Sequence, residues 1–220
     1  MASGKLNVLQ VCDHFGSEGS RMHGVTRLFA WMVPRFDPAR YSVSLVSLRK
    51  KDPSEETLDS LGVDVSYLHK STFDPATLTA LLKIIDHKAI DILHMHGYGA
   101  TTFGRAAGAM RRLPAILHEH ADLTDTSWFQ HLADRALEPF TDIALADSPH
   151  TAAFVVNARF VAPRKVRVVS PGVVGGDGDI GAFVRKMERL YAILHDVSRS
   201  THRRGVAEQD LSFLAPGQPA

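Results

Sequence analysis

The stretch from Ile90 to Glu119 reads IDILHMHGYGATTFGRAAGAMRRLPAILHE and contains one complete strand–helix–strand unit. Its two ends, Ile90–Met95 and Ala115–Glu119, are short runs rich in apolar residues, as expected of strands covered on both faces. The segment Thr101–Arg112 between them is predicted as a helix. Because a helical crossover joins neighbouring parallel strands, this stretch predicts a parallel α/β sheet.

The same alternation continues on both sides of this unit. We therefore predict a single doubly wound, mostly parallel, Rossmann-like α/β sheet with helices on both faces. The apolar residues at the start of one helix, Trp128, Phe129 and Leu132, recur at helical spacing and are expected in the core. The further predicted strands are Leu6–Val11, Tyr41–Leu48, Val63–Tyr67, Ile143–Ala146 and Val166–Ser170, and the further helices are Val25–Pro34, Pro75–His87, Ser127–Leu137 and Pro149–Ala158.

Composition favours an ordinary globular protein. The chain has 220 residues, a formal net charge of +1 and 45% hydrophobic residues, which is enough for one substantial core. The balanced charge argues against a nucleic-acid partner. One cysteine, Cys12, favours a reducing, cytoplasmic compartment, and neither a signal peptide nor a transmembrane helix is expected. The small basic segment Arg199–Arg204 is interpreted as a solvated helix end rather than a membrane contact.

The first predicted strand is followed by the loop Asp13–Gly24, which lies where ligands bind in such sheets. Its glycines match neither GxGxxG nor GxxxxGK[ST], so the sequence gives no specific support to NAD or ATP binding. A glycine at the start of a helix leaves free N–H groups that could meet an anion or a sugar hydroxyl. A flexible loop with turn glycines is the alternative interpretation.

Histidines end two of the predicted strands. His94 and His96 lie on one side of the strand that begins at Ile90, because side chains alternate along a strand. For the same reason, His118 and His120 lie on one side of the strand that begins at Ala115. If the two strands are neighbours, four imidazoles gather at one edge of the sheet. His-x-His pairs occur in zinc sites, and hydrogen-bonded histidines at strand ends are the alternative.

Several motifs occur together in one order. They are Asn7–Val11, the loop that closes at Gly24, Asp91–Gly97, Pro114–His120 and Val166–Val173. The series resembles the N-terminal, acceptor-side domain of the family 4 retaining glycosyltransferases, which have the two-domain GT-B architecture. The resemblance covers about residues 5 to 174.

The resemblance implies roles for individual residues. His120 would be catalytic, lying beside the donor sugar, where it hydrogen-bonds the sugar or assists its departure. Gly24 would approach the donor phosphate and the acceptor, and His23 stands where the family usually has a glycine. His94, His96 and His118 complete the set of substrate-binding candidates. The family uses nucleotide-sugar donors without a catalytic metal, so no metal ligand and no other cofactor is predicted.

The family's second domain, which holds the nucleotide, is not recognisable in the sequence. Glu188 and Glu208 are the only glutamates after Gly172, so the pair of glutamates separated by seven residues (Glu-x7-Glu) that marks that domain is absent. The stripe of Phe183, Met187, Leu190, Tyr191 and Leu194 resembles the final family helix that crosses back onto the first domain. We therefore expect a Rossmann-like domain at 1–174, a Gly/Asp-rich bridge at 175–182, a returning helix at 183–204 and a tail at 205–220.

Two functional hypotheses follow from this organisation. In the first, the chain is a truncated or engineered transferase half that folds alone, keeps an acceptor-side cleft with weak sugar or nucleotide binding, and transfers little or no sugar. In the second, a second chain or a homodimer partner completes an active transferase. A homo-oligomer through the exposed interdomain face is compatible with both. A histidine-based metallohydrolase is a more remote alternative.

Overall fold

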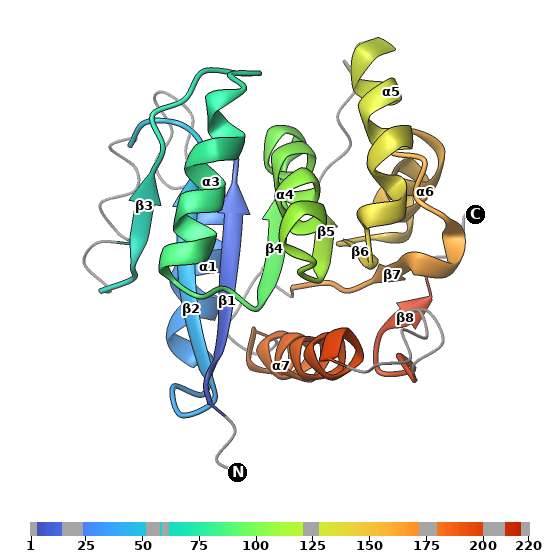
Figure 1. Ribbon diagram of the computed structural model, residues 1–220. Coiled ribbons are helices and arrows are strands. Elements are labelled where there is room, and N and C mark those ends of the chain that lie inside the picture. Colours follow the sequence, from blue (N-terminus) through green and yellow to red (C-terminus); the bar gives the residue numbers. More distant parts are fainter. Residues whose placement is uncertain are drawn as a thin grey trace.

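The computed structural model describes residues 4–14, 24–51, 58, 62–120, 128–171, 180–199 and 210–216. These residues form one eight-stranded sheet in the order β3-β2-β1-β4-β5-β6-β7-β8 (Figure 1). All neighbouring strands pair in parallel except β7 and β8, which are antiparallel. The strands are β1 Leu6–Cys12, β2 Tyr41–Ser47, β3 Val65–Tyr67, β4 Ile92–His96, β5 Ala115–Glu119, β6 Ile143–Ala146, β7 Val166–Val168 and β8 Ala215–Pro216. The predicted doubly wound sheet is confirmed.

Helices cover both faces of the sheet. On one face, α1 and α7 share a core cluster with residues of β1, β4, β5 and β6. On the other face, α3 and α4 pack against β1 and β4, and α6 packs against β6. The helices are α1 Gly24–Met32, α3 Ala76–His87, α4 Tyr98–Arg111, α5 Trp128–Leu137, α6 Pro149–Asn157 and α7 Ile180–Arg199. The long α7 runs across the strands rather than along them (Figure 1).

The central strand β4 shows how the alternation of side chains serves both layers. Ile92 belongs to the cluster under α1 and α7, whereas Leu93 and Met95 belong to the cluster under α3 and α4. On the second face, Gly104 of α4 lies directly over Met95, because a Cβ atom there would lie only 2.2 Å from the Met95 Sδ. His94 and His96 therefore face the α1 and α7 layer, together with Ile92.

The final helix docks on the sheet, as its apolar stripe predicts. Seven of its side chains are buried, namely Ile180, Phe183, Val184, Met187, Leu190, Tyr191 and Leu194. Each large apolar side chain that is fully buried contributes about 1.5–3 kcal/mol, so α7 is part of the core and no appendage. The helix begins at Ile180, three residues before the expected start, and is described as far as Arg199. Most of the predicted Gly/Asp bridge and of the basic segment after Arg199 lies outside the described residues.

Two expectations differ from the structure. Trp128, Phe129 and Leu132 were expected in the core, but they are 76%, 42% and 61% exposed. The reason is that α5 turns its other side inward, where Asp134 is buried against arginines. In addition, the segment expected as a tail contains β8, and Leu211 and Leu214 just before it are buried. In the part of the chain that the structure describes, no helix is both long and apolar enough to cross a membrane.

Candidate functional site

Polar side chains gather at the carboxyl edge of the sheet, where parallel strands end together. His96 is the last residue of β4, and His120 follows β5 directly. Asp13 follows β1 and Asp147 follows β6 in the same way. In open α/β sheets ligands bind outside this edge, so the structure places these groups where a ligand site is expected.

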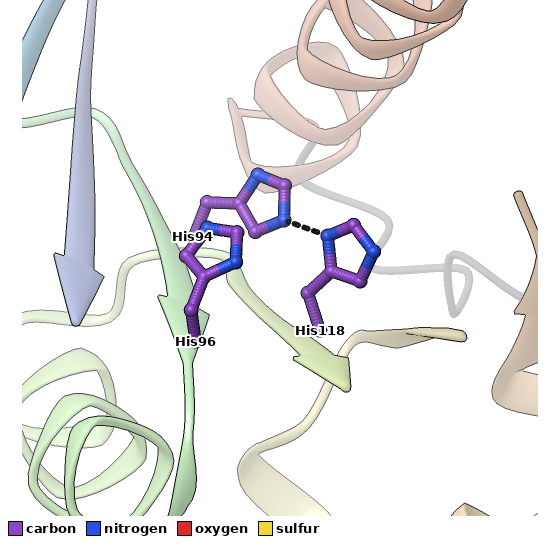
Figure 2. Close-up of side chains that lie close together, drawn as sticks. All are labelled: His94, His96 and His118. Carbon is purple, nitrogen blue, oxygen red and sulfur yellow. Dashed lines mark hydrogen bonds between the residues drawn. The ribbon is translucent and has the colours of Figure 1, made fainter. Parts of the chain in front are cut away.

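One half of a hydrogen-bonded network crosses the sheet from α7 to β6. The Tyr191 hydroxyl of α7 lies 2.8 Å from His94 Nδ1, and His94 Nε2 lies 3.1 Å from His118 Nδ1. His118 Nε2 is 2.9 Å from Asp147 Oδ1. Figure 2 shows the two imidazoles of His94 and His118 with their nitrogens turned toward one another and His96 beside them. These contacts link a helix near the end of the chain to the carboxyl edge of the sheet.

The other half returns from Asp147 to α7. Asp147 Oδ2 lies 2.8 Å from His120 Nδ1, and His120 Nε2 lies 2.8 Å from His96 Nδ1. His96 Nε2 donates to Gln10 Oε1 at 2.8 Å, because a carbonyl oxygen can only accept. The Gln10 amide in turn donates to the Tyr191 hydroxyl at 2.8 Å. Seven hydrogen bonds thus close a ring of seven residues, which we call the histidine ring: Gln10, His94, His96, His118, His120, Asp147 and Tyr191.

Burial governs the ionisation of the histidine ring. His94 and His118 are fully buried and His96 is 3% exposed, and this burial lowers the pKa of all three, that of His118 to about 4. Burial tends to raise the pKa of Asp147, but hydrogen bonds from His118 and His120 outweigh it and hold that pKa below its ordinary value. The most exposed side chains of the ring are those of His120 and Asp147, at 18% and 22%. The ionised carboxylate of Asp147 therefore lies at the edge of the sheet.

The donor atoms in the ring are close enough to surround a cation. One nitrogen each from His94, His96 and His118 lie within 4.8 Å of one another, and so do ligand atoms of His118, His120 and Asp147. However, every one of these ring nitrogens and both carboxylate oxygens already have a hydrogen-bond partner inside the histidine ring. The geometry thus accounts for all these polar atoms without a metal ion.

The opposite face of the sheet carries a second network made of full charges, which we call the arginine network. Arg159 is fully buried and pairs with Glu119 and with Asp134, whose Oδ2 lies 2.9 Å from the guanidinium Nε. The buried Arg105 also pairs with Asp134, and the Thr101 hydroxyl accepts from Arg159. The four charged groups are all buried, and each is paired with a group of opposite charge. Their ion pairs connect β5, α4, α5 and the segment after α6.

Asp13 has a structural partner at the same edge. Its carboxylate accepts hydrogen bonds from the backbone N–H groups of Gly99 at 2.9 Å and Ala100 at 2.6 Å, in the first turn of α4. Burial raises the pKa of Asp13, although both N–H groups oppose the shift. A Cβ at Gly99 would lie 2.7 Å from Asp13 Oδ1, so the close approach requires glycine there. Asp13 therefore fixes the start of α4 beside β1.

The structure brings together four of the predicted site residues. His94, His96, His118 and His120 share the histidine ring, while Gly24 is the first residue of α1 and His23 lies outside the described residues. Helix α1 reaches the ring through Phe29, whose ring centroid lies 5.1 Å from that of His96. The roles that the resemblance assigns to these residues stay predictions.

Sequence reasoning missed three members of the ring. Asp147 could have been found, because it directly follows a predicted strand just as His120 does. Gln10 could have been noticed as a polar residue among the apolar Val8, Leu9 and Val11 of its strand. Tyr191 was recognised only as part of an apolar stripe, and its hydroxyl partner lies 97 residues away in the sequence.

The parallel sheet, its crossing final helix and the polar carboxyl edge define half of a GT-B fold. Residues 22–174 match the model of the family described as Glycosyltransferase Family 4. The match covers more than half of the chain, and the chain belongs to this family. The resemblance inferred from the motifs is thus confirmed. No curated protein matches the chain in sequence.

Solved structures with the same fold are distant in sequence. A glycosyltransferase from Rickettsia africae is 13% identical with a TM-score of 0.61, over 78% of this chain and 44% of that protein. Anabaena HepE, solved with UDP and glucose, is 15% identical with a TM-score of 0.55, over 84% and 50%. A Neisseria meningitidis UDP-GlcNAc 2-epimerase bound to UDP-GlcNAc is 13% identical with a TM-score of 0.51, over 89% and 53%. The chain spans about half the length of these proteins.

Proposed function

We propose that this chain is the acceptor-side half of a nucleotide-sugar-dependent glycosyltransferase, and that it transfers little or no sugar by itself. The observation that carries the proposal is internal to the fold. Helix α7 packs back onto the sheet from Ile180, and only eleven residues separate it from the end of β7 at Val168. The segment between them is far too short for the second Rossmann domain that would hold the nucleotide.

His120 is proposed as the residue that faces the donor sugar. Its side chain is the most exposed of the four ring imidazoles and lies at the carboxyl edge. Both of its nitrogens are already hydrogen-bonded, to Asp147 and His96. We therefore infer that His120 acts mainly from a fixed position beside a departing nucleotide diphosphate, rather than as a free hydrogen-bond donor.

A working transferase completed by a second copy of the chain is the second candidate. The exposed aromatic residues favour it: Phe73 and Phe129 are in contact, with ring centroids 5.2 Å apart, and Trp128 adjoins them. Trp128 and Phe129 begin α5 and Phe73 precedes α3, so they lie at the carboxyl edge, because crossover helices start there. An apolar patch at this edge suits contact with another protein body.

Calorimetry and a transfer assay test the proposal. UDP-glucose and UDP-GlcNAc serve as probes at concentrations up to millimolar, with the full chain and a His120→Ala variant. We expect weak heat or none, and no sugar transfer above the level of the variant. Efficient transfer by the chain that is lost in His120→Ala would contradict the inactive half and support the completed transferase.

The second candidate has its own test in sedimentation velocity. A Trp128→Ser/Phe129→Ser double variant is compared with Met110→Ser, which removes an equally exposed apolar residue from the far end of α4. Concentration-dependent dimers that only the double variant abolishes would support completion by a second copy. Monomers at all concentrations would exclude it.

A further inference from the structure

The number of protons needed to fill the hydrogen bonds of the histidine ring indicates the charge of its members. Each of its seven hydrogen bonds needs one proton, and two members have a fixed role. Gln10 donates at its amide nitrogen and accepts at its oxygen, and the ionised Asp147 accepts at both oxygens. The two pairs of imidazoles between these fixed points can therefore be counted separately.

The pair His94 and His118 balances without a charge. Three hydrogen bonds join Tyr191, His94, His118 and Asp147. The Tyr191 hydroxyl supplies one proton, and each neutral imidazole supplies one more. All three bonds are filled when Tyr191 donates to His94 Nδ1, His94 Nε2 donates to His118 Nδ1, and His118 Nε2 donates to Asp147.

The pair His96 and His120 does not balance in this way. Three hydrogen bonds join Asp147, His120, His96 and the Gln10 carbonyl, and both ends of this path are acceptors. Two neutral imidazoles supply only two protons for the three bonds. The third bond requires an additional proton on one imidazole. His120, partly exposed and next to the carboxylate of Asp147, is the better place for it than the buried His96.

Tyr191 determines which of the two imidazole pairs lies between two hydrogen-bond acceptors. The Gln10 amide nitrogen donates to the Tyr191 oxygen, which leaves the Tyr191 proton for His94 and the Gln10 oxygen for His96. If the amide were reversed, Gln10 would donate to His96, and the path to Asp147 would be filled by two neutral imidazoles. We propose that Tyr191 is a positioning residue that acts through Gln10 and His96 to hold His120 as an imidazolium.

The protonation of His120 does not depend on the proposed function. Only the catalytic use of this charge rests on the proposed function. A fixed positive charge at His120 would lie where the negative charge of a departing nucleotide diphosphate develops, and would need no rearrangement at the moment of reaction. The charge itself can be measured without any donor sugar. A failure of the inference is therefore distinguishable from a failure of the transferase assignment.

The test is a long-range proton–nitrogen NMR spectrum of histidine-labelled full chain at pH 7, which reports the protonation of each ring nitrogen. Tyr191→Phe keeps the stacking on Phe36 but frees the Gln10 amide, so we expect His120 to become neutral and His96 to move its proton to Nδ1. The matched control is Tyr41→Phe, which removes a buried hydroxyl that donates to the Glu188 carbonyl outside the ring. We expect His120 to stay doubly protonated there.

Asp147→Asn provides a second variant that keeps all seven hydrogen bonds. The asparagine oxygen accepts from His118 and its amide donates to His120 Nδ1, so His120 is expected as a neutral Nε2–H imidazole. A doubly protonated His120 in Tyr191→Phe or in Asp147→Asn, or its loss in Tyr41→Phe, would overturn the proposal.

Discussion

His118 and Glu119 are neighbours on β5, yet they belong to two different kinds of polar network. His118 faces α7 and joins the histidine ring, in which three imidazoles are held neutral by burial. Glu119 faces the other side and pairs with the buried Arg159. On one face of the sheet, hydrogen bonds between mostly neutral side chains hold the network, and its single ionic pair is His120 with Asp147. On the other face, pairs of full charges hold the network. The comparison indicates that the arginine network depends on paired full charges, whereas the histidine ring depends on where its protons lie.

The largest expected effect comes from breaking the arginine network. Arg159→Met leaves the carboxylates of Glu119 and Asp134 buried with fewer partners, and should lower the free energy of unfolding by about 3–5 kcal/mol. Urea unfolding followed by fluorescence measures the change. Arg111→Met, which removes an exposed pair with Asp86, is the matched control and should leave stability nearly unchanged. Equal losses in the two variants would contradict the structural role of the network.

The buried imidazoles of the histidine ring should make the folded protein less stable in acid. The folded-state pKa values of His94, His96 and His118 lie below their ordinary value of 6.5, so the unfolded chain binds protons there before the folded chain does. Their contribution to stability is complete above pH 6.5 and is lost as the pH falls toward the folded values, near 4 for His118. Each histidine can cost up to about 1.4 kcal/mol per pH unit in this window. Urea midpoints that do not change between pH 7 and pH 5 would refute the neutral state of these three buried imidazoles.

An aspartate-to-asparagine substitution in each network compares the two faces of the sheet, and we expect a smaller effect than for Arg159→Met. Asp134→Asn leaves Arg105 and Arg159 without their shared anion, whereas Asp147→Asn can keep both of its hydrogen bonds in neutral form. We expect Asp134→Asn to be more destabilising by about 2 kcal/mol in urea unfolding at pH 7. If Asp147→Asn proves the more destabilising of the two, the histidine ring depends on its charge for folding.

The sequence predicts the sheet well because apolar strands and their spacing are local signals. Ala115–Glu119 and Ile143–Ala146 have the expected bounds, and the two His-x-His pairs face one another as the alternation requires. The orientation of α5 could not be predicted, since helical periodicity does not reveal that Asp134 has buried arginine partners. The closure of the ring was equally hidden, because the Gln10–Tyr191 bond joins residues 181 positions apart.

The central claim of a single ionic pair in the histidine ring can be tested on the unmodified chain. The long-range proton–nitrogen spectrum at pH 7 should show His94, His96 and His118 as neutral imidazoles protonated at Nε2, and His120 protonated at both nitrogens. A spectrum with His120 neutral, or with a second cation among the three buried histidines, would contradict it.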